Sequence, residues 1–137
     1  MTADAITASL TLLYSTLSAD ATLMGYITGV FQDIAPTGTQ APYCVIGVQA
    51  PGLDTLTATA VRILTQPLLS VRIVGPAAEM ETMSAAYARA DALLALIRQD
   101  PATGVTLYRE QGLYRPEPQL INGEPWVNLG GLYRAVY

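Results

Sequence analysis

Residues 63–98 read ILTQPLLSVRIVGPAAEMETMSAAYARADALLALIR. The spacing of the apolar residues changes midway through this stretch. In the first part apolar and polar faces alternate; the apolar face holds Ile63, Leu69, Val71 and Ile73, and the polar face holds Gln66, Ser70 and Arg72. After Pro76 the apolar residues recur at steps of three and four, at Met80, Met83, Tyr87, Ala90, Leu94 and Ile97. The stretch therefore predicts a half-buried strand over 63–74 and a helix from Pro76 to Arg98, with proline at the first helical position.

Two features concern the start of this strand. Pro67 cannot donate a hydrogen bond to a sheet ladder, so we expect an edge or a bulge there. The preceding residues 50–62 contain Pro51 and Gly52 and predict a loop of about a dozen residues, a length at which loops tend to be functional or disordered. Whether this loop becomes ordered only on assembly stays open.

The N-terminal region predicts two helices. Four apolar residues spaced by four, three and four form one stripe from Ala3 to Leu17, namely Ile6, Leu10, Leu13 and Leu17. Ser18 is a good N-cap for a second helix of about two turns, where Asp20 favours the positive end of the helix dipole. Gly29 is expected to end it.

The remaining strands are shorter or more interrupted. They are predicted at 30–34, 43–49, 105–109 and 126–137. Between the last two, Gly112, Pro116 and Pro118 break the pattern, and Asn122-Gly123 is a dipeptide typical of hairpins. The order helices, strands, helix, strands predicts one α+β domain over residues 1–137, with a mainly antiparallel sheet, N-terminal helices and one long helix packed on one face.

Composition indicates a surface that is partly covered by other molecules. Hydrophobic residues make up 51% of the chain and charged residues 13%, about half of the roughly 25% typical of soluble domains. All seven basic residues are arginine, the cation that interfaces prefer. We interpret this as a sign of assembly, although a composition bias explains it about equally well.

The same composition argues against several functions. The chain has no histidine and no lysine, which removes the usual general base, zinc ligand and phosphate-binding lysine. The lone Cys44 lies on the apolar face of a predicted strand and is expected to be a buried thiol. Carboxylates are scattered without metal-ligand spacing. We therefore predict no enzyme activity, no catalytic residues, and no metal or cofactor.

Charge and hydropathy limit the partners. A net charge of −4 does not favour tight binding of nucleic acid, which needs a basic stripe. No apolar run approaches the roughly eighteen residues that span a bilayer, so we expect no membrane partner. Nothing at the N-terminus indicates secretion, and a reducing cytoplasm is the expected site of folding.

Four segments together resemble a known family. They are LLYSTLSADATL (12–23), PYCVIG (42–47), LSVRIV (69–74) and the alanine-rich helix up to Leu96. Their order is similar to that in the tail completion or tail terminator proteins of long-tailed phages and gene transfer agents. The resemblance covers residues 9 to 98; Pro67 and the interrupted stretch from Gly112 to Pro125 depart from it.

The resemblance implies a structural ring subunit of a virion or phage-like particle, assembled in the host cytoplasm and located at the junction of tail and neck. It implies a homo-hexamer that caps the head-proximal end of the tail tube, stops its growth, contacts the tube protein and a neck or stopper protein, and lets DNA pass through its lumen without specific binding.

Tyrosine, tryptophan and arginine dominate protein interfaces. We therefore expect the contacts between subunits to involve the loop 50–62 and the residues Arg62, Arg72, Trp126, Tyr133, Arg134 and Tyr137. Arg62 or Arg72 is expected to pair with a carboxylate of the neighbouring subunit.

Two other interpretations remain at this stage. Another neck component, a connector or stopper, would also be a small ring subunit without chemistry. A monomeric ligand-binding module or small enzyme would instead show a polar pocket with shifted carboxylates.

Overall fold

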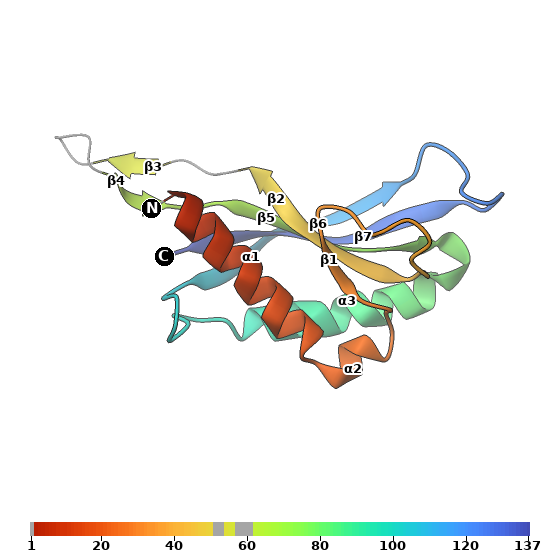
Figure 1. Cartoon of the computed structure of the whole chain (residues 1–137), viewed down its shortest axis with the longest axis horizontal. Coiled ribbons are helices and arrows are strands. Elements are labelled where there is room, and N and C mark those ends of the chain that lie inside the picture. The colour runs from red at the N-terminus through yellow and green to blue at the C-terminus, as the bar shows by residue number, and fades with distance from the viewer. Residues whose placement is uncertain (1, 51–53, 57–61) are drawn as a thin grey trace.

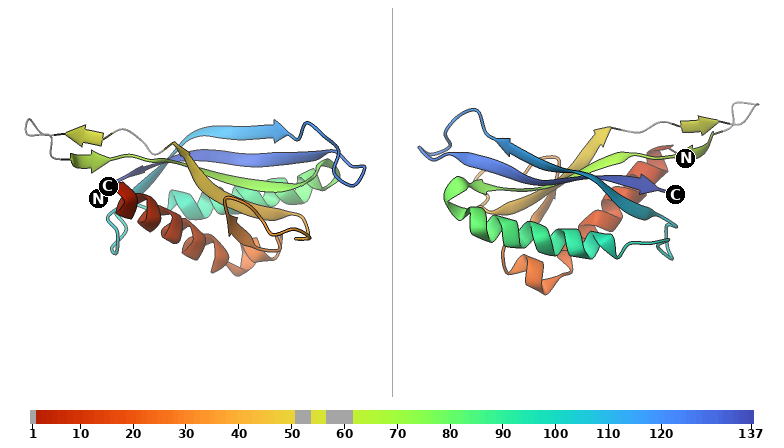
Figure 2. Two further views of the ribbon diagram at one scale, coloured as in Figure 1. Left: turned by 45° about the horizontal axis from the view of Figure 1, so that its top comes forward. Right: turned by 180° about the vertical axis from the view of Figure 1, so that it is seen from behind.

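The computed structural model describes residues 2–50, 54–56 and 62–137. In chain order the elements are α1 (Thr2–Ser18), α2 (Ala21–Met24), β1 (Val30–Gln32), β2 (Tyr43–Ala50), β3 (Asp54–Leu56), β4 (Arg62–Thr65), β5 (Leu68–Pro76), the 3₁₀ turn η1 (Ala77–Glu79), α3 (Met80–Ala95), β6 (Thr106–Pro116) and β7 (Trp126–Val136). Figures 1 and 2 show the helices on one side of a twisted sheet. None of these helices has the length and apolar character needed to cross a membrane.

Five strands form the main sheet in the order β1-β2-β5-β7-β6. The short β1 runs parallel to β2, and the other neighbouring pairs are antiparallel. The strands β3 and β4 form a separate two-stranded unit that extends from the end of the domain, as Figure 1 shows. The predicted α+β fold with a mainly antiparallel sheet and a long helix on one face is thus confirmed.

The core lies between the helices and one face of the sheet. In β5 this face consists of Leu69, Val71 and Ile73, which are fully buried. The first helix packs on β1 and β2, and α3 packs on β5, β6 and β7. The predicted helical stripes supply the opposite side of the core, with Leu13 and Leu17 from α1 fully buried. Burying apolar side chains against the sheet is what holds these helices in place.

The predicted strand over 63–74 is wrong in its continuity. Residues 62–65 pair with β3, whereas 68–76 lie at the centre of the main sheet. The break falls at Gln66 and Pro67, because proline has no N–H to continue a ladder. The carbonyl of Pro67 still accepts a hydrogen bond from the amide of Ala135. Part of the expected loop 50–62 is strand β3, and residues 51–53 and 57–61 lie outside the described residues.

The second helix also differs from its prediction. Asp20, and not Ser18, is the N-cap, because its carboxylate accepts a hydrogen bond from the amide of Leu23 at 2.9 Å. The Ser18 hydroxyl donates instead to the carbonyl of Tyr14, within α1. The helix ends at Met24 and is capped by Gly25, so it is shorter than the expected two turns.

The C-terminal strands are longer and more regular than the sequence indicated. The interrupted stretch is strand up to Pro116, with one irregularity in register between Arg109 and Gln111 that absorbs an extra residue. The expected turn at Asn122-Gly123 is present: both residues have positive φ, 52° and 76°, and Ile121 and Glu124 form an isolated bridge around them.

Candidate functional site

The sheet face opposite the helices carries three of the six residues that sequence reasoning assigned to subunit contacts, namely Arg72, Trp126 and Arg134. We call it the open sheet face. Register defines it, because residues that share a face alternate along each strand. Its central pairs are Leu68 with Arg134, Ser70 with Leu132, Arg72 with Gly130, Val74 with Asn128 and Pro76 with Trp126. No helix from the described residues packs on this face (Figure 2).

One end of the open sheet face is aromatic. The rings of Phe31 and Tyr43 meet edge to face with centroids 6.0 Å apart, and Tyr43 lies 6.4 Å from Trp126. The indole nitrogen of Trp126 is buried and has no hydrogen-bond partner among the described residues. Burial also raises the pKa of Tyr43. This end is therefore an aromatic and largely apolar surface, of the kind that protein contacts favour.

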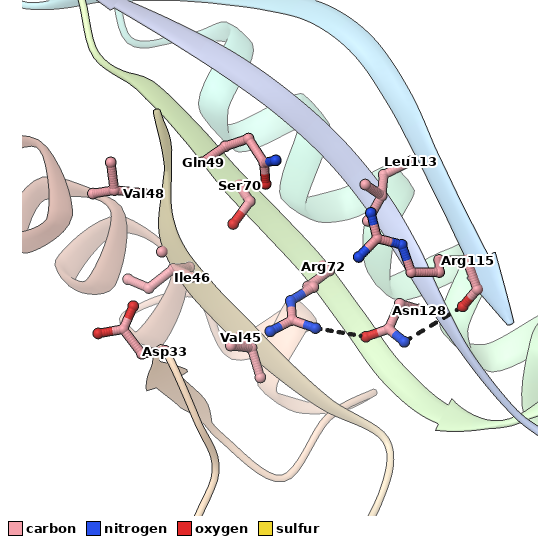
Figure 3. A pocket seen from close by; sticks show the side chains of 11 residues that line it. Asp33, Val45, Ile46, Val48, Gln49, Ser70, Arg72, Leu113, Arg115 and Asn128 are labelled. Carbon is pink, nitrogen blue, oxygen red and sulfur yellow. Dashed lines mark hydrogen bonds between the residues drawn. The ribbon is translucent and has the colours of Figure 1, made fainter. Parts of the chain in front are cut away.

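A polar hollow of about 220 Å³ lies beside the aromatic end (Figure 3). The guanidinium of Arg72 donates to Asn128 Oδ1 at 2.9 Å, and Asn128 Nδ2 donates to Glu117 Oε1 at 2.7 Å. Asn128 is 2% exposed, so its amide has one fixed orientation. Arg115, from β6, extends across β7 towards Arg72 (Figure 3). Both guanidinium groups therefore face one hollow, and we call it the arginine pocket.

The opposite wall of the arginine pocket is acidic and narrow. Asp33 follows β1 with a positive φ of 64°, a conformation that aspartate tolerates better than most residues. A Cβ built on Gly47 would lie 3.1 Å from Asp33 Oδ1 and 3.6 Å from Ser70 Oγ. Because residue 47 is a glycine, the Asp33 carboxylate can lie close to the backbone of β2 at the bottom of the hollow. Gln49 and Ser70 complete the polar lining.

The far end of the open sheet face is held by an ion pair within the chain. Arg134 donates to both oxygens of Glu110, from Nε at 2.9 Å and from Nη2 at 3.3 Å. Its Nη1 also donates to the carbonyl of Gln66 at 2.9 Å. The guanidinium therefore ties the junction between β4 and β5 to the edge strand, which leaves it few donors for another molecule.

The residues predicted for subunit contacts divide between the two faces. Arg72, Trp126 and Arg134 share the open sheet face, with Trp126 at its aromatic end and Arg134 at its far end. Tyr133 belongs to the core: it is 2% exposed, and its hydroxyl donates to Asp91 Oδ1 at 2.6 Å. Because it presents almost no surface, we do not include it in a contact surface.

The last two predicted residues lie elsewhere. Tyr137, on the helix side, lies at 2.6 Å from the Ser9 hydroxyl. Arg62 begins β4, and its side chain lies outside the described part of the structure.

Sequence reasoning missed Arg115, Asn128, Phe31 and Tyr43 as members of this site. Arg115 lies in the stretch expected to be irregular, so its face was not assigned. The sequence from 112 to 115 places Leu113 and Arg115 on one face of a strand and Gly112 and Tyr114 on the other. This alternation indicates the face of Arg115, but the glycine and the nearby prolines weaken the pattern. Asn128 becomes informative only through its bond to Arg72, 56 positions away in the chain.

A second hollow of about 550 Å³ lies between α3 and β6, on the helix side. Gly112 and Gly130 are among its lining residues, and Tyr114, which is 61% exposed, lies beside it. Arg109 covers the ring of Tyr87 at 5.5 Å from the centroid. The hollow is mostly lined by apolar atoms, which fits a contact side chain better than a charged substrate.

Reactive groups in the described residues are few. Cys44 is fully buried on the helix side, as expected, and burial raises the pKa of its thiol to about 12. Among the side chains that the structure describes, no three carboxylates or thiols gather closely enough to hold a metal ion. What the open sheet face offers is hydrogen-bond donors, aromatic surface and positive charge.

The fold is similar to that of a chain in the virion of a native gene transfer agent (GTA) particle. The TM-score is 0.60 at 20% sequence identity, and the match covers 91% of this chain and 92% of that chain. At this identity the likeness concerns the fold. No protein-family model matches the sequence, and none of the curated proteins matches it. The assignment to the tail terminator family therefore stays a prediction.

Proposed function

We propose that the chain is a structural subunit of a phage-type or gene-transfer-agent virion, and that it forms a hexameric ring on the head-proximal end of the tail tube. In this role it ends tube polymerisation and joins the tail to the neck. The main support is the match to a GTA virion chain, which extends over more than nine tenths of both chains. A non-enzymatic role agrees with a chain that contains no histidine and no lysine.

Size supports a ring of several copies. A globular chain of 137 residues has a radius of gyration of about 14 Å, too small for one copy to surround duplex DNA. A channel for DNA therefore needs several copies joined head to tail in a closed ring. A net charge of −4 and the absence of lysine suit such a channel, because every neutralised phosphate would retard the passing DNA.

We place the contact between subunits on the open sheet face, with Trp126 and Arg72 at its centre, and on the unit formed by β3 and β4. Trp126 and Tyr43 supply aromatic surface there, and aromatic side chains are enriched at protein contacts. The extended β3–β4 unit stands away from the body of the domain, where a neighbour can contact both of its sides (Figure 1).

Assembly can be tested with the purified chain and with the tube protein of its particle. We expect sedimentation velocity and negative-stain microscopy to show closed rings, either alone or on the ends of tubes, and we expect added chain to stop tube growth. Trp126→Ala and Arg72→Ala should weaken the rings, whereas Arg98→Ala, an exposed residue stacked on Tyr108, should not. If the wild type forms rings and both variants form them equally well, the contact surface has been assigned wrongly.

The binding partner separates a terminator from a connector or stopper. A terminator binds the end of the tube protein, whereas a stopper binds the adaptor on the portal side. A chain that stays monomeric at high concentration and binds neither partner would contradict the ring proposal and favour the ligand-binding alternative.

A further inference from the structure

The arginine pocket brings together two guanidinium groups that pair with no carboxylate of the described residues, while Asp33 lines its opposite wall and Glu117 accepts a hydrogen bond from Asn128. Among the described residues, Arg72 donates to the neutral amide of Asn128, and neither Arg72 nor Arg115 forms an ion pair. Two guanidinium groups that face one hollow repel each other, and the hollow excludes part of the water that would screen them. Such an arrangement is stabilised when an anion enters between them.

We propose that the arginine pocket receives a carboxylate from the start of α3 of a second copy of this chain, supplied by Glu79 or Glu81. The inference rests on the proposed ring, and it assigns to that ring the pair of chemical groups that joins one subunit to the next.

Shape and chemistry favour a carboxylate. A guanidinium is planar and presents parallel N–H donors that match the two oxygens of a carboxylate. Asn128 fixes one nitrogen of Arg72 and leaves the remaining donors of that guanidinium for a guest. The hollow of about 220 Å³ has room for the end of an acidic side chain. Asp33 on the opposite wall repels any anionic guest, and it repels a guest with two negative charges more strongly than a single carboxylate.

The chain itself supplies the complementary surface. Acidic residues outnumber arginines by eleven to seven, and Glu79 and Glu81 are exposed and form no ion pair with the described residues. They lie at the start of α3, on the helix side, whereas the arginine pocket opens on the other face of the sheet. A head-to-tail contact needs two complementary surfaces on different sides of one subunit. These two patches meet that requirement.

The first experiment measures ring association by sedimentation velocity in Arg72→Gln/Arg115→Gln, with Arg98→Gln as the matched control. Glutamine at position 72 keeps a donor for Asn128. We expect association to weaken at least about 30-fold in the double variant and to stay unchanged in the control. Circular dichroism melts identify a variant that has lost its fold.

The second experiment exchanges the charges at exposed positions, where substitutions seldom affect folding. Arg115→Glu and Glu81→Arg are measured singly and together, and the same cycle is run with Glu79→Arg. We expect each single variant to weaken ring association. We expect at least one of the two combinations to associate at least about tenfold more tightly than the sum of its single variants predicts.

Each outcome decides between the two proposals. Rings that form normally in Arg72→Gln/Arg115→Gln, or charge exchanges that are purely additive in both cycles, overturn the pocket assignment and leave the ring intact. A wild-type chain that forms no ring, alone or on tubes, overturns the ring and the assignment together.

Discussion

The backbone of Gly131 lies so close to the hydroxyl of Tyr87 that no side chain fits between them. Tyr87 projects from α3 onto β7, and its hydroxyl lies 2.8 Å from that of Tyr133. The neighbouring Gly130 is equally confined, because a Cβ there would overlap the carbonyl oxygen of Val71 in β5. Gly131 therefore permits the close approach of α3 to β7, and Gly130 permits the close approach of β5 to β7, in the middle of a strand where glycine otherwise weakens pairing.

We expect Gly131→Ala to destabilise the fold by about 1–3 kcal/mol, because the methyl group would displace the Tyr87 hydroxyl from its hydrogen bond. Gly130→Ala should cost more, since its methyl would meet backbone atoms that cannot rotate away. Gly112→Ala is the control, because its nearest neighbour is the flexible end of Arg109. Urea denaturation measures all three; equal losses for Gly112 and Gly130 would contradict the explanation.

The tyrosine pair makes a prediction at alkaline pH. Tyr133 donates to Asp91, so Tyr87 donates to Tyr133, and burial raises the pKa of both hydroxyls above the ordinary value of 10.0. The folded chain keeps these protons at a pH where the unfolded chain loses them. Stability should therefore be full below about pH 10 and fall as pH rises further. Tyr133→Phe should cost about 1–3 kcal/mol at neutral pH and flatten this alkaline decline.

Tyr87→Phe is the matched comparison. It removes one donor and leaves the bond between Tyr133 and Asp91 in place, so it should cost about 1 kcal/mol, less than Tyr133→Phe. Urea denaturation of the wild type and both variants at several pH values measures these differences in stability. An alkaline decline that is equally steep in wild type and Tyr133→Phe would show that other groups cause it.

Local periodicity predicted the helices α1 and α3 and the strands β2 and β7, because each buries a stripe that repeats within a few residues. Periodicity failed where strand pairing with distant residues outweighed the local preference of glycine or proline. The second half of β6 pairs fully with β7, although Gly112 and Pro116 weaken its pattern. Pro67 divides the expected strand because the chain leaves one sheet there and enters another.

The site was harder to predict than the fold, since it depends on register. Trp126 and Arg72 share a face only because Trp126 pairs with Pro76 and Arg72 with Gly130, across a long connection. Tyr133 has the residue type of a contact residue, but its position in the strand turns it towards α3. Composition could suggest which residue types make contacts, and strand pairing decided which of them reach the surface.

The ion pair between Asp20 and Arg89 should make the fold sensitive to acid. Arg89 donates to both oxygens of Asp20, at 2.8 and 2.9 Å, and the amide of Leu23 also donates to it. These bonds, chiefly that from Arg89, lower the pKa of Asp20 from 3.8 to about 2. On acidification the unfolded chain binds this proton first, so the stabilisation is present above about pH 4 and is lost as pH falls towards about 2.

Asp20→Asn should therefore be less stable than wild type at neutral pH, and the difference should disappear near pH 2. Glu124→Gln, a change at an exposed carboxylate, should leave the acid profile unaltered. Thermal melts by circular dichroism across this range measure the effect. A constant difference between Asp20→Asn and wild type at every pH would mean that the capping geometry matters and the charge does not.

Cys44 should be unreactive in the folded chain. Its side chain is fully buried on β2 opposite Ile73, and burial raises its thiol pKa from 9.0 to about 12. A shift of three units lowers the thiolate fraction about 1,000-fold at neutral pH, and the thiolate is the reactive form. Alkylation of the native chain should be at least that much slower than alkylation in denaturant, where the rate should match a free cysteine. Rapid alkylation without loss of structure would show that the helix layer opens over β2, and would place Cys44 among reactive residues after all.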